Sequence, residues 1–209
     1  MITNIIPAND AAIPVILQVL NTGGLVAFPT DTVYGLGCSI TDSAAIERIY
    51  QVKERSHLKS IAVLIGSPEQ INLLASLLPP AADKLIHRFF PGALTLVVPR
   101  RPELPSNLSA SQTIGVRMPD HPFATTLLQR TGPLAVTSAN ISGEANPITA
   151  QDVLAQLDGR IELVVDGGAC PGGIPSTVVD CTQPNVSILR LGGISKEAIL
   201  SCLAESDDI

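Results

Sequence analysis

A cluster of cationic residues and a polar loop are the two parts of this sequence best suited to binding an anionic ligand. The cluster occupies every second position of one segment and consists of Lys53, Arg55, His57 and Lys59. The loop follows an apolar run at 134–136 and continues as Thr-Ser-Ala-Asn-Ile-Ser-Gly over 137–143. Lysine and arginine neutralise phosphate or carboxylate groups, while short hydroxyl and amide side chains donate and accept hydrogen bonds. Together they indicate a small-molecule site.

The spacing of the cationic cluster leaves two interpretations open. In an extended segment, side chains at alternate positions project from one face about 6.6 Å apart, where they could contact a triphosphate. In a turn or helix the same side chains diverge, and the cluster is then a solvated basic turn. Because charge runs are usually surface features, the spacing alone favours the solvated turn.

Other candidate groups point toward binding rather than nucleophilic catalysis. Arg117 and Arg190 end expected strands and could clamp an anion bidentately, or be ordinary ion-paired strand ends. Ser138 lies outside any Gly-x-Ser-x-Gly elbow and none of the three histidines has an evident acidic partner, so a triad is not expected. Neither a Walker loop nor a dinucleotide-binding glycine motif follows an expected strand. Metal-ligand spacing is also missing, so any Mg²⁺ would accompany a nucleotide.

Composition places the chain among globular proteins with an aliphatic core. The 209 residues are 45% hydrophobic and 3% aromatic, contain no Trp, and carry a formal net charge of -6. The low aromatic content disfavours binding of nucleic acid by base stacking, and the negative net charge disfavours binding by overall electrostatic attraction. Four scattered cysteines and the lack of a long apolar run predict a cytoplasmic protein without membrane spans. The length fits a single domain over 1–209.

Apolar runs and helical periodicities alternate along the chain and predict an α/β domain. We expect helices at 10–21, 43–52, 80–89, 122–129, 149–157 and 195–204. We expect strands at 25–28, 61–65, 94–98, 113–117, 134–136, 163–165, 177–180 and 188–191. Asn9 should cap the first helix, Ser67 should cap another that begins at Pro68, and residues 35–37 should form a turn. Functional residues are then expected in loops at strand ends.

The motifs, taken together, resemble those of the YrdC-type threonylcarbamoyl-AMP synthases. The matches span about 28–190 and comprise Pro-Thr-Asp-Thr-Val-Tyr-Gly-Leu at 29–36, Lys-x-Arg at 53–55, Pro-Gly-x-Leu-Thr at 91–95, Thr-x-Gly-Val-Arg at 113–117, Thr-Ser-Ala-Asn-x-Ser-Gly at 137–143 and Ser-Thr-Val at 176–178. Each motif is weak alone, but their order is specific. The chain resembles short family members that lack an extra carboxy-terminal domain. The resemblance implies one domain with a twisted mixed β-sheet, flanking helices and a concave cationic cavity.

The resemblance also implies a reaction and its participants. L-threonine, bicarbonate and ATP would give threonylcarbamoyl-AMP and pyrophosphate, with Mg²⁺ accompanying ATP. Partner proteins would use the product to modify adenosine in tRNAs that read codons beginning with A. Two alternatives remain: an RNA-binding module of the same fold that contacts tRNA or other RNA, and a paralogue with a different acyl acceptor. The acidic charge weighs against the first, and the intact Thr-Ser-Ala-Asn sequence weighs against the second.

Site residues follow from the resemblance position by position. The Lys-x-Arg and Ser-x-Asn signatures assign the catalytic nucleotide-handling group to Lys53, Arg55, Ser138 and Asn140. ATP contacts are implied for Arg55, Lys59, Thr113, Ala139, Pro147 and Arg190. L-Threonine contacts are implied for Thr32, Arg117, Thr137 and Ser176, with Arg117 on the α-carboxylate. Many relatives have Pro and later Asn-Pro-Leu after the conserved arginine, and this chain departs from them at Ser56, Lys59, Ser60 and Ile61. It also has Leu64 where some relatives have His.

Overall fold

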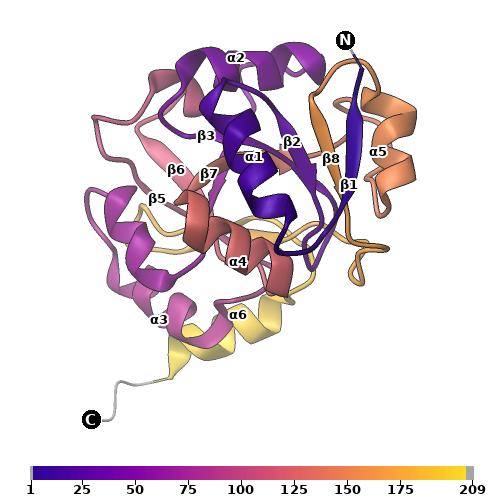
Figure 1. Cartoon of the computed structure of the whole chain (residues 1–209). Coiled ribbons are helices and arrows are strands. Elements are labelled where there is room, and N and C mark those ends of the chain that lie inside the picture. Colours follow the sequence, from indigo (N-terminus) through magenta and orange to yellow (C-terminus); the bar gives the residue numbers. More distant parts are fainter. Residues whose placement is uncertain (1, 206–209) are drawn as a thin grey trace.

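A mixed β-sheet runs through the part of the chain that the computed structural model describes, residues 2–205 (Figure 1). Its strands are β1 (Asn4–Pro7), β2 (Val26–Phe28), β3 (Gly35–Ser39), β4 (Ala62–Leu64), β5 (Leu94–Pro99), β6 (Thr113–Arg117), β7 (Leu134–Ser138), β8 (Leu163–Asp166), β9 (Thr177–Asp180) and β10 (Ser187–Arg190). Their spatial order is β1-β8-β2-β3-β7-β4-β6-β5-β9-β10. The sheet contains both parallel pairs, such as β4 with β6, and antiparallel pairs, such as β5 with β6. The expected mixed α/β fold is confirmed.

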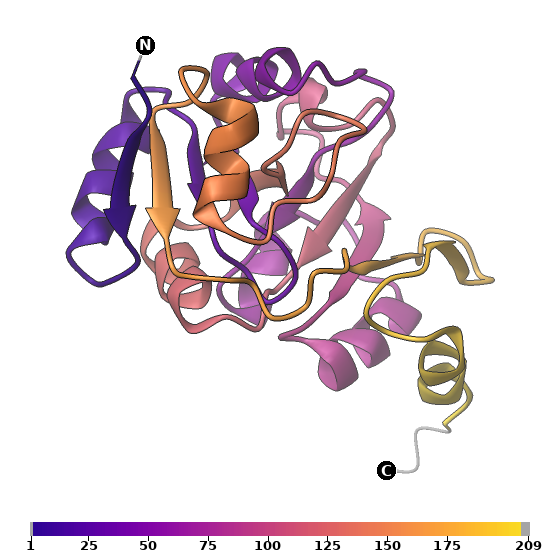
Figure 2. The same ribbon diagram turned by 90° about the vertical axis from the view of Figure 1, so that its right-hand side faces the viewer.

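Helices cover the sheet around two apolar cores. They are α1 (Ala12–Asn21), α2 (Ser43–Val52), α3 (Pro80–Phe89), α4 (Pro122–Thr131), α5 (Ala150–Leu157) and α6 (Lys196–Ala204), with short 3-10 helices at Pro68–Leu73 and Ser106–Leu108. The apolar sides of α1 and α4 share one core with β2, β7 and β8 (Figure 1). A larger core joins the other helices to the sheet. In Figure 2, α6 lies beside the β9–β10 hairpin at one side of the molecule.

Local side-chain chemistry explains where several helices begin. Thr149 and Asp152 form a reciprocal capping box at the start of α5, with Thr149 Oγ1 accepting from the Asp152 N–H at 3.2 Å. Ser195 Oγ accepts from the Ala198 N–H at the start of α6. Asp42 Oδ1 does the same for α2, by accepting from the Ala45 N–H at 2.9 Å. These caps satisfy amide groups that the first helical turn leaves unpaired.

Three expected elements differ from the structure. The stretch 35–37 is the start of β3 rather than a turn, because it pairs with both β2 and β7 and this pairing outweighs the glycine content. The first helix begins at Ala12, and its N-cap Ala11 makes no side-chain hydrogen bond, so Asn9 is not the cap. The segment after Ser67 forms a 3-10 helix without a side-chain cap. Strand β1 was not expected at all.

Strand alternation directs one set of side chains toward a common hollow. Along β6, Thr113, Gly115 and Arg117 face that hollow, whereas Ile114 and Val116 point into the larger core. A Cβ added at Gly115 would lie 3.2 Å from the Thr95 methyl group, so this strand position favours a residue without a side chain. The floor of the hollow is therefore one face of the sheet. Within residues 2–205, no helix combines the length and apolarity needed to cross a membrane.

Candidate active site

The hollow is a cavity of about 480 Å³ above β4, β5, β6 and β9. Three arginines line it, namely Arg55, Arg117 and Arg190. Hydroxyl groups line it as well, from Thr30, Thr32, Tyr34, Ser60, Thr95, Ser109, Ser111, Thr113, Thr137, Ser138 and Ser176. The one lining carboxylate among the described residues is Asp180. Small-molecule sites commonly have volumes of about 300–1,000 Å³, so this cavity suits a polar, anionic small ligand.

The structure brings together most, but not all, of the residues that the sequence predicts for the site. Those that line the cavity are Thr32, Arg55, Thr113, Arg117, Thr137, Ser138, Ser176 and Arg190. Those that do not are Lys53, Lys59, Ala139, Asn140 and Pro147. The structure therefore supports a direct ligand contact only for the residues that line the cavity. The roles of the other five residues must be explained by their contacts with the rest of the protein.

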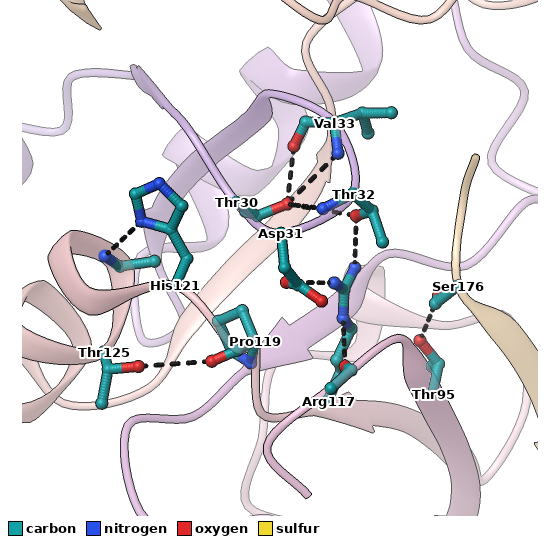
Figure 3. Close-up of polar contacts among 12 residues, drawn as sticks. Thr30, Asp31, Thr32, Val33, Thr95, Arg117, Pro119, His121, Thr125 and Ser176 are labelled. Atoms are coloured by element: carbon teal, nitrogen blue, oxygen red, sulfur yellow. Dashed lines mark hydrogen bonds and ion pairs between the residues drawn. The ribbon is translucent and has the colours of Figure 1, made fainter. Parts of the chain in front are cut away.

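Arg117 lies at the end of β6 and is tied to the loop that follows β2 (Figure 3). Its Nη2 lies 2.5 Å from Asp31 Oδ1, its Nη1 donates to Thr32 Oγ1 at 2.8 Å, and its Nε donates to the Gly92 carbonyl. Both partners of the ion pair are largely buried. Burial lowers the pKa of Arg117, and the Asp31 carboxylate opposes that effect. Arg117 thus enters the site in a fixed orientation, with further N–H groups available.

Arg190 and Ser176 form a second fixed unit. The Arg190 Nε and Nη2 atoms both donate to the Ser176 carbonyl, at 3.1 and 2.8 Å, and Nη2 also lies 3.2 Å from Ser176 Oγ. Ser176 Oγ is 2.7 Å from Thr95 Oγ1 (Figure 3). Burial lowers the pKa of Arg190. These contacts leave Arg190 without a carboxylate partner among residues 2–205, so its charge is available to a ligand.

Arg55 is held by backbone carbonyls of the turn that follows it. Its Nε donates to Lys59 O at 3.1 Å and its Nη2 donates to Ser60 O at 2.8 Å. Burial lowers the pKa of Arg55, and the positive charge of Arg190 lowers it further. The same charge contributes to the lowered pKa of Arg117. The Arg190 charge therefore acts on both of the other guanidinium groups, and an anion bound near Arg190 would offset that repulsion.

Lys53 is buried, so neither interpretation of the cationic cluster describes it. The residue ends α2 and is 1% exposed, and the chain then turns through Glu54, which has a positive φ of 53°. The ammonium donates to the Ser138 carbonyl at 2.5 Å, to the Asn140 carbonyl, and to Asn140 Oδ1 at 3.3 Å. In return, the Lys53 carbonyl accepts from the Ser142 N–H at 2.8 Å. Lys53 therefore fastens the polar loop to the end of α2.

Burial, together with the smaller effects of the Arg55 and Lys59 charges, lowers the pKa of Lys53 to about 7. An unfolded lysine has a pKa of about 10.4, so between these values the unfolded chain binds a proton that the folded chain has lost. The free energy of unfolding should therefore rise from pH 7 toward pH 10. In K53M this contribution should be absent. Urea denaturation of both proteins at pH 7 and pH 9 measures it, and an equal pH dependence in the two would contradict the assignment.

Of the remaining predicted residues, Asn140, Ala139 and Pro147 hold the polar loop in place, whereas Lys59 is exposed and its carbonyl accepts from Arg55. Asn140 is 4% exposed, accepts from Ser138 Oγ at 2.5 Å and donates to the Glu144 carbonyl at 2.8 Å. The Ala139 N–H donates to the Tyr34 carbonyl, and the Pro147 carbonyl accepts from the Tyr34 N–H, both at 2.9 Å. These bonds position the loop beside β3. Asn140, Ala139 and Pro147 thus shape the cavity wall from behind.

The histidines differ from expectation in one respect. His57 Nε2 lies 3.0 Å from Glu47 Oε1 and its ring stacks on Tyr50, while His87 lies 3.7 Å from Asp83. Two of the three therefore do have acidic partners at exposed positions, His87 within α3 and His57 in the turn that follows α2. Neither histidine lines the cavity.

Several residues in or beside the cavity were not predicted as site residues. Asp31 lies within a recognised motif, but its pairing with Arg117 bridges residues far apart in sequence. Ser60, Ser109 and Ser111 carry no motif, although the alternation of Ser109 and Ser111 with Thr113 was a usable signal of a common strand face. Asp180, at the end of β9, was predicted only as part of a strand.

A mixed α/β fold with three arginines and many hydroxyl groups on one face of its sheet suits the class of proteins that bind small anionic ligands. Comparison with known proteins identifies the family within this class. The family model Sua5_yciO_yrdC, described as "Telomere recombination", matches residues 18–192. The chain therefore belongs to the Sua5/YciO/YrdC family.

Individual relatives agree with this assignment. The threonylcarbamoyl-AMP synthase of Bacillus subtilis is 40% identical over 201 residues, covering 95% of this chain and 58% of the relative. The crystal structure of P. abyssi Sua5 complexed with L-threonine superimposes with a TM-score of 0.91 at 38% identity, over 98% of this chain and 61% of that one. E. coli YciO superimposes with a TM-score of 0.85 at 25% identity, over 94% and 99%. The chain thus spans about three fifths of the first two relatives.

Proposed function

We propose that the chain is an L-threonylcarbamoyladenylate synthase, a nucleotidyltransferase that uses L-threonine, bicarbonate and ATP. The observation that carries this proposal is the distribution of charge in the cavity. Arg117 is already paired with Asp31, whereas Arg55 and Arg190 form no ion pair within residues 2–205. One part of the cavity is thus nearly neutral and suits a zwitterion, and the other is cationic and suits a polyphosphate.

L-Threonine would occupy the part around Arg117. The free N–H groups of that guanidinium suit the α-carboxylate, and hydroxyls of Thr32, Thr137 and Ser176 suit the amine and the side chain. The L-threonine complex of P. abyssi Sua5, a protein of the same fold, supports this assignment. The Asp31 carboxylate would add an attraction for the ammonium group.

ATP would occupy the part between Arg55 and Arg190. Both guanidinium groups are oriented by backbone carbonyls, so little side-chain entropy remains to be lost when phosphate binds. Thr113 and Ser138 line the same cavity and would donate or accept hydrogen bonds. Lys59, Ala139 and Pro147 lie outside the lining, and we assign them no direct contact.

The reaction needs two steps that conserve atoms and charge. The threonine ammonium first loses a proton to solvent, and the free amine then condenses with bicarbonate to form an N-carboxylate and water. A carbamate oxygen then attacks the α-phosphorus of ATP, the bond to the bridging oxygen of the β-phosphate breaks, and pyrophosphate leaves. The protein would act by holding two anions together and neutralising the charge that develops, which typically contributes several kcal/mol. Exclusion of water would protect the labile carbamate.

Any Mg²⁺ would enter with ATP. Among residues 2–205, no group of three or more His, Cys, Asp or Glu side chains is placed to hold a metal ion. Asp180 and the surrounding hydroxyl groups could contact such an ion only alongside phosphate oxygens. The product would pass to partner proteins that modify adenosine in tRNA.

Replacement of Arg55 tests the nucleotide part of the site. In R55A, we expect kcat/KM for ATP to fall about 10- to 100-fold, because a charged phosphate contact is lost. The free energy of unfolding should change by less than about 1 kcal/mol, since Arg55 bonds only to adjacent turn carbonyls. Pyrophosphate release in the presence of all three substrates is the assay.

The matched control is R130A, which removes an exposed arginine at the end of α4 that does not line the cavity. Its activity should equal that of the wild type. Equal rates for R55A and the wild type would contradict the assignment of Arg55. A wild type that releases no pyrophosphate would contradict the proposed function itself.

A further inference from the structure

Four hydroxyl side chains form a continuous row on the cavity wall beside Arg55. Ser60 Oγ lies 2.9 Å from Ser109 Oγ, which lies 3.1 Å from Ser111 Oγ. Ser111 Oγ in turn lies 2.7 Å from Thr113 Oγ1. All four residues line the cavity. We call Ser60, Ser109, Ser111 and Thr113 the hydroxyl row.

Ser109 couples the two halves of the row. The backbone N–H of Ser111 donates to Ser109 Oγ at 3.2 Å and occupies one of the two acceptor positions of that hydroxyl. Ser109 therefore accepts from one neighbouring hydroxyl and donates its own proton to the other. Because Ser109 is only 4% exposed, water cannot readily replace either neighbour. The direction of the hydrogen bond toward Ser60 consequently determines the direction toward Ser111.

An anion at the Ser60 end determines every proton position in the row. Arg55 donates to the Ser60 carbonyl at 2.8 Å, which places its guanidinium group beside Ser60. An anionic oxygen held jointly by Arg55 and the Ser60 hydroxyl would accept the proton of that hydroxyl. Ser60 must then accept from Ser109, Ser109 from Ser111, and Ser111 from Thr113. All four hydroxyl protons of the row are then donated in these hydrogen bonds. Thr113 Oγ1 is left able only to accept a hydrogen bond from the ligand.

We propose that the hydroxyl row is a hydrogen-bond relay that selects a ligand with a phosphate at the Ser60 end and an N–H or O–H donor at the Thr113 end. This inference rests on the proposed function, because the ligand is ATP. The donor is either the exocyclic amine of adenine or a ribose hydroxyl. Ser60, Ser109 and Ser111 are then positioning residues, and bonds in such a chain strengthen one another.

Calorimetric titration can test the relay with four nucleotides and one inorganic anion. Inosine triphosphate replaces the amine with a keto oxygen, and 2′-deoxy-ATP and 3′-deoxy-ATP each lack one hydroxyl. We expect one of these analogues to bind the wild type about tenfold more weakly than ATP, which identifies the donor. In S109A the break in the row should reduce that preference at least about threefold. S109T, which keeps the hydroxyl, should retain it.

Inorganic tripolyphosphate tests the other end of the row. S60A should bind it about tenfold more weakly than the wild type, because a hydrogen bond to an anion is lost. If Ser109 had a purely structural role, S109A would bind all nucleotides more weakly by the same factor. The preference for ATP over the analogue would then be unchanged. That result, the lack of any preference in the wild type, or undiminished tripolyphosphate binding by S60A would each overturn the relay. A wild type that neither binds ATP nor releases pyrophosphate would overturn the proposed function as well.

Discussion

Replacement of Arg117 by methionine should abolish detectable turnover and lower the free energy of unfolding by about 3–5 kcal/mol. The side chain of Arg117 is 8% exposed and that of its partner Asp31 is 13% exposed. Loss of the guanidinium leaves this carboxylate buried without a counter-charge, which accounts for the loss of stability. It also removes the group that we assign to the α-carboxylate of threonine. Chemical denaturation and pyrophosphate release measure the two effects.

The double variant D31N/R117M separates these effects. Neutralising Asp31 removes the uncompensated buried charge, so most of the lost stability should return. Activity should stay absent because no cation remains for the substrate carboxylate. Recovery of turnover together with stability would show that Arg117 acts only by pairing with Asp31.

K53M should lower turnover at least about 100-fold although Lys53 does not line the cavity. The ammonium holds the Ser138 and Asn140 carbonyls, and without it we expect the end of β7, which carries Thr137 and Ser138, to shift together with the loop that follows. Displacements of about 1 Å are enough to cause losses of this size. The free energy of unfolding should fall by about 1–3 kcal/mol, because buried acceptors lose their donor. Steady-state kinetics and urea denaturation at pH 7 measure both.

The control for Lys53 is K196M, which removes an exposed lysine at the start of α6. This variant should retain wild-type activity and stability. A K53M protein as active as K196M would contradict the view that Lys53 positions the polar loop.

Much of the fold was predictable because local signals agreed with the final pairing. Helix 43–52 has the same bounds in the structure as in the sequence analysis, and strand 113–117 does too. The prediction of a turn at 35–37 was wrong. Its glycines suggested a turn, whereas two neighbouring strands hold the segment extended. Such pairing depends on residues distant in sequence, in this instance β7, which the local composition does not reveal.

The candidate site, like the fold, was predictable only where local sequence was sufficient. Arg55, Arg117 and Arg190 were predicted and line one cavity. The burial of Lys53 was not predictable, because alternating charges are typical of a surface and its acceptor carbonyls lie 85 and 87 residues away. The pairing of Asp31 with Arg117 escaped prediction for the same reason. Residue types indicated the chemistry, and tertiary contacts decided which side chains could take part.

Mass spectrometry of the reaction products tests the central claim most directly. The purified chain is incubated with ATP, Mg²⁺, ¹³C-labelled bicarbonate and an equimolar mixture of amino acids. We predict a single new adenylate that contains threonine and one labelled carbon, formed together with pyrophosphate. An adenylate of another amino acid, an unlabelled adenylate, or unchanged ATP would contradict the proposed function.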